Sequence, residues 1–381
     1  QHHAGRTARR ARRRQAPAVN KLVNDAMQPT PVASGLRAAQ APAPGQGAAS
    51  VHPRDVLLGA QAQTGFLPVC DHYSGVEARM RKSLQLQAEM AQEFGTCVFD
   101  VTLDCEDGAP VGLESAHAAL VANLALNAAP GARVAARVHA VDHPAFANDV
   151  ATIAGEAGHR LCHIMIPKVE SVDDVLLAER ALERASAAHV PLHVLIESPA
   201  AVQRAFDIVA HPRVQSLSFG LMDFVSAHGG AIPAQAMTSA GQFTHPLVVR
   251  AKLEIASACH AHGKVPSHCV VTEFSDMAAL QGAAGRASRE LGYTRMWSIH
   301  PAQIRTILQA FAPQQDDIDS AARIIAAAAL ADWAPISVDG VLHDRASYRF
   351  YWQILERAHR TGRALPLAVR QWFDASALVP S

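Results

Sequence analysis

The chain has 381 residues, of which 49% are hydrophobic and 18% are charged, and its 34 basic side chains balance its 34 acidic ones. This composition excludes a disordered chain, and no apolar run approaches the roughly 18–20 residues that a membrane-spanning helix needs. The cysteines are scattered, without a CxxC pair or the spacing of a zinc site, which is typical of reduced thiols in a cytoplasmic protein.

The amino-terminal part of the chain differs from the rest. Residues 6–14 (RTARRARRR) hold six arginines, and Asp25 is the only acidic residue before Met27. Such a basic arm could bind nucleic acid or act as an address, but nothing in the later sequence supports a nucleic-acid partner, and we favour an over-extended reading frame or a non-native remnant for residues 1–26. Residues 28–50 are rich in Pro, Ala, Gly and Ser and predict a disordered lead-in. We therefore leave residues 1–50 out of the predicted fold.

From residue 65 onward, short apolar runs alternate with helical patterns. The helical patterns include residues 76–95, 171–187 and 248–263. Strands that alternate with helices predict a parallel sheet, and residues 51–312 fit an α/β (β/α)8 TIM barrel of about 250 residues as the catalytic domain. A doubly wound open sheet is the alternative, although no GxGxxG motif follows the first strand. The predicted strands lie at residues 65–70, 97–107, 133–140, 163–170, 191–198, 214–224, 264–271 and 294–301.

Residues 313–381 predict a C-terminal helical extension. Residues 316–333 have a helical pattern, an Asp-Gly turn follows within residues 338–341, and Asp344 opens a second helix that ends at Gly362. This segment is too small to stand alone, so we expect it to pack on its own barrel or on a neighbouring subunit.

Ionisable residues follow the predicted strands, always at the carboxyl end. Because these ends form the active-site rim of a barrel, the pattern predicts one polar pocket. The residues, in chain order, are Asp104, Glu106, Asp107, Arg137, His139, Lys168, Glu170, Glu197, Asp223, His268 and His300.

Glu197 and Asp223 each follow a very apolar strand. Two converging carboxylates without a cysteine or a histidine pair favour a hard cation with oxygen ligands, Mg²⁺ or Mn²⁺. The alternative is that either acid is only the N-cap of the next helix. Arg137 is a candidate clamp for an oxyanion or a carboxylate, with an ordinary salt bridge as its alternative.

The three acids Asp104, Glu106 and Asp107 could bind the metal directly. We expect instead that they lie behind the ligands and hold Arg137 or metal-bound waters.

Six of these stretches together resemble the HpcH/HpaI aldolase and citrate lyase β-subunit family, which includes malyl-CoA and citramalyl-CoA lyases. The resemblance covers roughly residues 97–312 and implies a TIM barrel, a divalent metal, and cleavage or formation of a carbon–carbon bond beside a carbonyl, often on a CoA thioester. The stretches are LDCEDG (103–108), ARVHAVDHP (136–144), IMIPKVES (164–171), LIESPAAV (195–202), SFGLMDF (218–224) and SIHPAQI (298–304).

The resemblance also implies roles for single residues. Glu197 and Asp223 match the metal ligands, and Arg137 matches the residue that contacts the keto or hydroxy-acid oxygens. Residues 338–349 are similar to the family's C-terminal segment, whose aspartate, here Asp344, reaches a neighbouring subunit's site and requires a homo-oligomer, a trimer or a hexamer.

Basic residues near the first strand meet the CoA phosphates in family members that use CoA. Arg81 and Lys82 are the candidates for this cofactor-binding role, with plain surface solvation as the alternative.

The chain departs from the family pattern in the first strand, at His268 and in the loop 229–246, which leaves the substrate open. We expect a Mg²⁺-dependent lyase that cleaves or forms a 3-hydroxyacyl-CoA such as malyl-CoA or citramalyl-CoA, giving a 2-keto acid and an acyl-CoA. The alternatives are a pyruvate-type aldolase that uses the same metal without CoA, a thioesterase, and a citrate-lyase-like β subunit that acts only within a complex.

Overall fold

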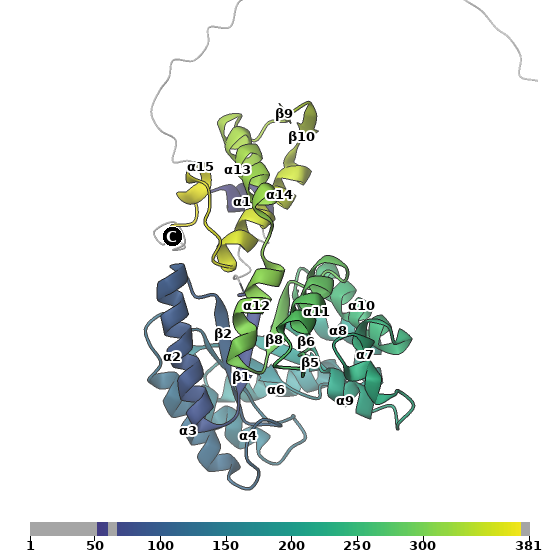
Figure 1. Cartoon of the computed structure of the whole chain (residues 1–381). Coiled ribbons are helices and arrows are strands. Elements are labelled where there is room, and N and C mark those ends of the chain that lie inside the picture. Colours follow the sequence, from purple (N-terminus) through teal and green to yellow (C-terminus); the bar gives the residue numbers. More distant parts are fainter. Residues whose placement is uncertain (1–51, 60–66, 375–381) are drawn as a thin grey trace, which may run out of the picture. The chain divides into compact units, whose positions relative to one another are not determined.

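The computed structural model describes residues 52–59 and 67–374. Within them, eight parallel strands close into a barrel in which each strand pairs with the next and β8 pairs with β1 (Figure 1). The predicted TIM barrel is confirmed, and the open-sheet alternative is wrong. The predicted lead-in, residues 1–50, lies outside the described residues. The strands are β1 Cys70–Ser74, β2 Phe99–Asp104, β3 Val134–Arg137, β4 Leu161–Ile166, β5 Leu192–Ile196, β6 Val214–Phe219, β7 Val265–His268 and β8 Arg295–Ser298.

Helices alternate with these strands and bury their apolar faces against them (Figure 1). Ser171 begins α6 with a capping box, and Gly95 ends α2 in the left-handed conformation that glycine adopts without strain. The helices of the barrel are α2 Glu77–Phe94, α3 Glu114–Leu126, α4 Phe146–Asp149, α5 Gly155–Ala157, α6 Val172–Arg184, α7 Pro199–Gln203, α8 Ala205–Ala210, α9 Leu221–Ser226, α10 Pro246–Ala261, α11 Met277–Arg289 and α12 Pro301–Phe311.

The first strand differs from its prediction. We expected it within the apolar run 65–70, but β1 begins at Cys70 and continues through polar residues. Asp71 and His72 are both almost fully buried. Their burial is tolerated because Asp71 pairs with Arg295 of β8 and His72 forms hydrogen bonds with Ser83 and Ser298. A polar strand of this kind shows no apolar pattern in the sequence, since its partners come from elements far along the chain.

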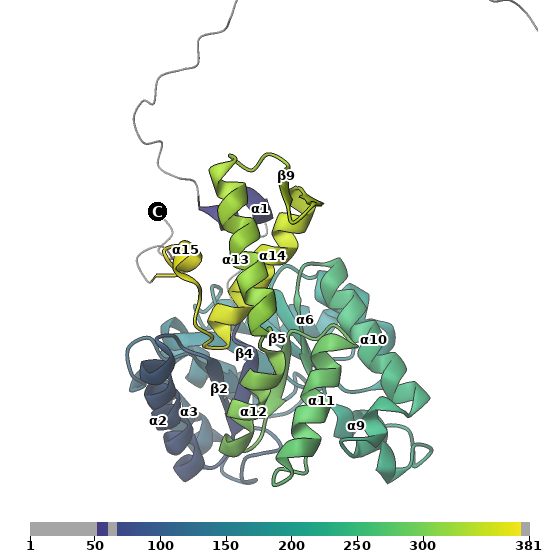
Figure 2. The ribbon, with the colours of Figure 1, turned by 45° about the horizontal axis from the view of Figure 1, so that its top comes forward.

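The residues after the barrel form helices and a hairpin with an apolar cluster of their own. In Figure 2, α1 (Pro53–Leu58) lies beside α13 (Gln315–Leu330) and α14 (Arg345–Arg360). The Asp-Gly turn is confirmed, since Asp339 and Gly340 have φ of 53° and 79° between β9 (Ile336–Val338) and β10 (Val341–His343). A short helix, α15 (Leu367–Arg370), follows. The buried residues include Leu57, Ile318, Ile325, Tyr348, Trp352 and Leu355.

Among the described residues, no helix combines the length and the apolar character needed to cross a membrane. All six cysteines are free thiols.

Candidate active site

Arg137 and Asp104 lie side by side at the ends of neighbouring strands. The register pairs Asp104 of β2 with Arg137 of β3, so the two side chains leave the barrel at the same level. Nε of Arg137 donates to Oδ1 of Asp104 at 2.6 Å, and Nη2 donates to Oδ2 at 2.7 Å. Burial opposes the charge of Arg137, but the charge of Asp104 raises the pKa of Arg137 well above its ordinary value. The guanidinium is therefore a fixed cation whose Nε and Nη2 are both bonded to Asp104.

Aromatic rings flank this guanidinium. Its central carbon lies 4.8 Å from the ring centroid of Tyr73 at the end of β1 and 6.0 Å from that of Trp297 in β8. Nε1 of Trp297 donates to Oγ of Ser218 at 3.0 Å, which fixes the indole. Planar guanidinium groups stack well on such rings, so Arg137 is restrained in two directions.

Glu106 bridges two cations. Its Oε2 lies 3.1 Å from Nη1 of Arg137, and its Oε1 accepts a short hydrogen bond from Nζ of Lys168. The Glu106 side chain is 7% exposed, whereas Asp107 is 58% exposed and lies 3.7 Å from the Lys168 ammonium. Glu106 thus belongs to the buried part of the site, and Asp107 lies at its outer edge.

Glu197 follows β5 and is 6% exposed. Its Oε1 accepts the backbone N–H of Lys168 at 2.6 Å. The register of β5 and β6 places Gly220 beside it, and a Cβ added at Gly220 would lie 2.5 Å from Oε2 of Glu197. Only glycine leaves room for this carboxylate.

Asp223 lies in the first turn of α9, and its side chain is half-buried. Burial first, and then the charge of Asp223, raise the pKa of Glu197 to about 8. Glu197 packs against Gly220, the N-cap of α9, so the two carboxylates lie at the start of the same helix, and no cation of the described residues forms an ion pair with Glu197.

The alternative role of these two acids as helix N-caps is wrong. Ser198 is the N-cap of α7 and accepts the N–H of Ala201, and Gly220 is the N-cap of α9. Neither Glu197 nor Asp223 satisfies a helix end. An all-oxygen pair fits a divalent cation such as Mg²⁺, which would relieve their repulsion and keep several water or substrate ligands, and the pKa of one member, Glu197, is raised by burial and then by the charge of its neighbour.

A different group of potential metal ligands lies deeper in the barrel. Ligand atoms of Asp71, His163 and His193 lie within 4.8 Å of one another. Arg295 already neutralises this group, since its Nη2 lies 2.9 Å from Oδ2 of Asp71 and 2.7 Å from Oδ2 of Asp100. We interpret this cluster as the buried ionic core of the barrel.

A cavity of about 670 Å³ opens at the ends of β1 and β8. Lys82 and Arg79 of α2 line it together with Phe274 and His300, whose rings stack with centroids 5.2 Å apart. Arg81 instead pairs with Glu77 on the exposed face of α2 at 2.7 Å, so of the two predicted basic residues only Lys82 lines the cavity. Arg79 is a lining residue that the sequence analysis missed.

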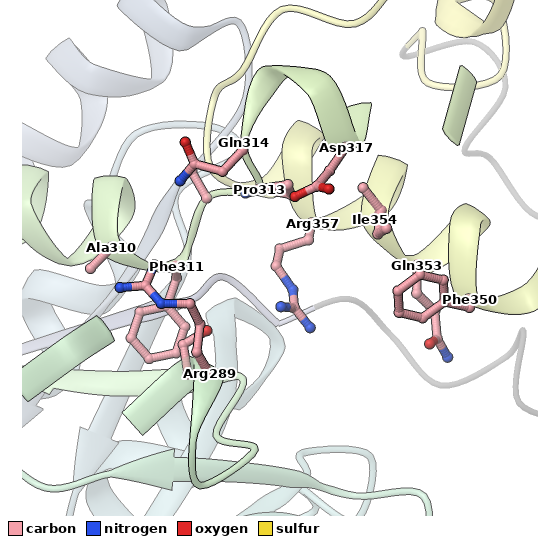
Figure 3. Close-up of a pocket in the computed structure, with 12 residues that line it drawn as sticks. Arg289, Ala310, Phe311, Pro313, Gln314, Asp317, Phe350, Gln353, Ile354 and Arg357 are labelled. Atoms are coloured by element: carbon pink, nitrogen blue, oxygen red, sulfur yellow. The ribbon is translucent and has the colours of Figure 1, made fainter. Parts of the chain in front are cut away.

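Figure 3 shows a separate cavity, lined by residues of α11, α12, α13 and α14. Its volume is about 260 Å³. Arg289 and Arg357 are among its lining residues, and none of the strand-end residues described above is. It is therefore distinct from the candidate site.

Asp344 is the N-cap of α14, where its Oδ1 accepts the N–H groups of Ala346 and Ser347. Within the described chain, all of its hydrogen bonds are to residues of its own helix start. The structure thus brings Asp104, Glu106, Arg137, Lys168, Glu197 and Asp223 together at one rim, and it does not bring Asp344 to them.

A protein-family model for HpcH/HpaI aldolase/citrate lyase matches residues 84–301. An L-malyl-CoA/β-methylmalyl-CoA lyase from Cereibacter sphaeroides is 33% identical over 245 residues, which cover 60% of this chain and 76% of the relative. The residues matched by the family model include all the strand-end acids and bases of the rim, and Tyr73 of β1 lies before them.

Solved structures resemble the chain as well. The crystal structure of a citrate lyase from Burkholderia xenovorans is 48% identical, with a TM-score of 0.69, over 85% of this chain and 99% of that chain. The CitE protein from Mycobacterium tuberculosis, in complex with magnesium, acetoacetate and coenzyme A, is 22% identical with a TM-score of 0.57, over 77% of this chain and 98% of that chain. The second likeness shows the fold alone.

Proposed function

The chain belongs to the HpcH/HpaI aldolase/citrate lyase family, and on that premise we propose that it is a Mg²⁺-dependent carbon–carbon lyase acting on a 3-hydroxyacyl-CoA. The substrate is of the malyl-CoA or citramalyl-CoA kind, and the products are a 2-keto acid and an acyl-CoA. One observation carries this proposal: Glu197, packed against Gly220 at the start of α9, and Asp223, in the first turn of that helix, lie at the same rim where Asp104 and Glu106 hold the guanidinium of Arg137.

Glu197 and Asp223 would hold the cation. When bound, Mg²⁺ supplies a Lewis acid that polarises the oxygen destined to become the keto group. Oε1 of Glu197 is already fixed by the Lys168 amide, so Oε2 is the oxygen left to serve as a ligand.

Arg137 provides the charge that stabilises the developing oxygen anion. Its guanidinium is held before substrate arrives, so little reorganisation is needed during the reaction. An arginine fork also fits the planar carboxylate of a 2-keto or 2-hydroxy acid. This role requires the Nη1 side of the guanidinium, which Asp104 does not occupy and which the substrate oxygen would share with Glu106.

The acyl-CoA part would occupy the cavity beside β1 and β8. Arg79 and Lys82 supply positive charge for phosphates, and the stacked rings of Phe274 and His300 offer an apolar face for a planar base. Tyr73, whose ring contacts Arg137, is followed in the sequence by Ser74, which lines this cavity. The two parts of the site are therefore adjacent along β1.

Asp344 from a neighbouring subunit would move the proton at the enolate carbon, which makes a homo-oligomer, a trimer or a hexamer, part of the proposal. Exposed apolar side chains near Asp344 support a contact there, since Leu342 is 74% exposed and Phe350 is 59% exposed. The scattered free thiols are consistent with a cytoplasmic enzyme.

The proposal is tested with Glu197→Gln and Asp223→Asn, assayed for cleavage of malyl-CoA and citramalyl-CoA with Mg²⁺. Both variants should fold and lose at least about 10³-fold in kcat/KM, because each removes one oxygen ligand of the cation. Asp207→Asn, an exposed acid on α8, is the matched control and should keep full activity. Retained turnover in either of the first two variants would overturn the assignment of the ligands.

A further inference from the structure

Lys168 has an unusual backbone conformation for its residue type. Its φ is 52°, in the left-handed region that favours glycine. The other non-glycine residues of this kind in the described chain are Ser186, Asp332, Trp333 and Asp339, which lie directly after helices or in the hairpin turn. Lys168 alone among them lies at the candidate active site, and strained backbone conformations concentrate at functional sites.

The strained conformation aims the backbone amide of Lys168 at Glu197. The N–H donates to Oε1 of Glu197 at 2.6 Å, and Gly220 closes the opposite side of the same carboxylate. The carboxylate therefore has one orientation, with Oε1 bonded to the amide and Oε2 packed against Gly220. A residue in ordinary strand geometry would direct this amide elsewhere.

The side chain of Lys168 reaches the other half of the site. Its ammonium pairs with Oε1 of Glu106, whose Oε2 lies 3.1 Å from Nη1 of Arg137. A continuous line of contacts thus runs from Glu197 through the amide and the ammonium of Lys168 to Glu106 and Arg137. One residue links the proposed metal ligand to the proposed oxyanion clamp.

We propose that Lys168 is a positioning residue that lowers the metal affinity of the site in exchange for the correct placement of Glu106 and Arg137. Its ammonium pairs with Glu106 and Asp107 and lies within reach of the charge of Asp223, one of the two proposed ligands, so it opposes a second cation there. The same charge holds Glu106 against Arg137. This inference rests on the proposed metal site at Glu197 and Asp223.

The experiment compares the full-length wild type with Lys168→Met and Lys168→Arg. Mn²⁺ alone is titrated into each metal-free protein and its dissociation constant is measured, and kcat and KM are then measured with saturating Mg²⁺. Met keeps the length of the side chain without the charge, and Arg restores the charge. Thermal unfolding confirms that each variant is folded.

We expect Lys168→Met to bind Mn²⁺ about three- to tenfold more tightly, because a repelling charge is gone. We also expect it to lose at least about tenfold in kcat, because Lys168 no longer holds Glu106 against Arg137. Lys168→Arg should return both values to within about threefold of the wild type. A merely structural role would not tighten Mn²⁺ binding. Any result in which the two changes of Lys168→Met do not occur together, or in which Lys168→Arg behaves like Lys168→Met, overturns the proposal.

A reference variant separates this inference from the function on which it rests. Glu197→Gln should weaken Mn²⁺ binding in the same titration. If it does so while Lys168→Met leaves Mn²⁺ binding unchanged, only the role of Lys168 is wrong. If Glu197→Gln binds Mn²⁺ like the wild type, the metal site and the role of Lys168 are both wrong.

Discussion

Arg137 and Asp104 form a two-pronged ion pair at the end of β2 and β3, with donor–acceptor distances of 2.6 and 2.7 Å and with 4% and 0% of the two side chains exposed. Asp104 also accepts the backbone N–H groups of Glu106 at 3.0 Å and of Gly108 at 2.8 Å. The loop that follows β2 and the guanidinium are thus oriented by the same carboxylate.

Asp104→Asn should impair both the reaction and the stability of the protein. The variant removes the two-pronged partner of a buried guanidinium and leaves it only Glu106, and breaking such a pair costs up to about 3–5 kcal/mol of unfolding free energy. We also expect kcat/KM to fall about 10²-fold as Arg137 loses its position. Steady-state kinetics and denaturant unfolding measure the two effects.

A control comes from an exposed arginine–carboxylate pair that is also joined by two hydrogen bonds. Glu93 accepts two hydrogen bonds from Arg305 on the surface of the barrel. Glu93→Gln should change neither activity nor the unfolding transition to a measurable degree, since exposed pairs contribute little. If Asp104→Asn were equally silent, the orientation of Arg137 would not depend on Asp104.

Gly220→Ala should damage the site through Glu197 alone. The added Cβ would lie 2.5 Å from Oε2 and 2.6 Å from Cβ of Glu197, so the carboxylate must move. We expect at least about a tenfold loss in kcat/KM, with a stability loss of about 1–3 kcal/mol. Gly282→Ala in α11 meets open space and should gain about 0.5–1 kcal/mol with full activity. Equal activity in the two variants would contradict the packing of Gly220 against Glu197.

Lys252 gives a prediction about pH. It is fully buried, its Nζ donates to Oε1 of Gln242 at 2.6 Å and lies 3.9 Å from the ring centroid of Phe243, and burial lowers its pKa to about 8. The unfolded chain has a lysine pKa of about 10.4, so between these two values the unfolded state binds more protons and the native state gains stability as pH rises. Charged Lys252 thus destabilises the fold below pH 8.

Lys252→Met should therefore raise the unfolding free energy at pH 7, by at most about 3 kcal/mol, and this gain should shrink steadily as pH rises toward 10. Sγ of Cys269 continues to donate to Gln242 in the variant, so no acceptor is left alone. Arg250→Met, an exposed change on the same helix, should show no trend with pH. A gain that stayed constant from pH 7 to pH 10 would contradict the lowered pKa.

Asp344 gives a test of the oligomer. Asp344→Ala and Glu197→Gln should each be inactive as pure proteins. If Asp344 completes a neighbour's site, subunits reassembled from an equal mixture should regain about a quarter of the wild-type activity, because a working site needs the barrel of one variant and the extension of the other. An inactive mixture, with subunit exchange verified, would show that Asp344 does not act across subunits.

Much of the fold and part of the site could be predicted from the sequence. Acids and bases that repeat at the carboxyl ends of apolar runs predict a common rim, because parallel strands end on the same side of a barrel. The strand β1 was displaced in the prediction because Asp71 and His72 are polar and become buried only through partners on β8 and α2.

The finer arrangement of the site depends on register and closure, which single stretches do not encode. Gly220 faces Glu197 only because β5 and β6 pair in one particular register. Tyr73 and Trp297 flank Arg137 only because β8 closes against β1. The positive φ of Lys168 could not be predicted from the residue type, since lysine rarely adopts this conformation.

The most direct test of the lyase assignment is substrate cleavage by the purified full-length chain with Mg²⁺, with and without EDTA. The panel is malyl-CoA, citramalyl-CoA and free 4-hydroxy-2-keto acids, and loss of each compound is followed together with formation of the keto acid. We predict that a CoA ester is cleaved to a 2-keto acid and an acyl-CoA, and that EDTA abolishes the reaction. Cleavage that persists in EDTA, or that occurs only with the free acids, would contradict a metal-dependent CoA-ester lyase.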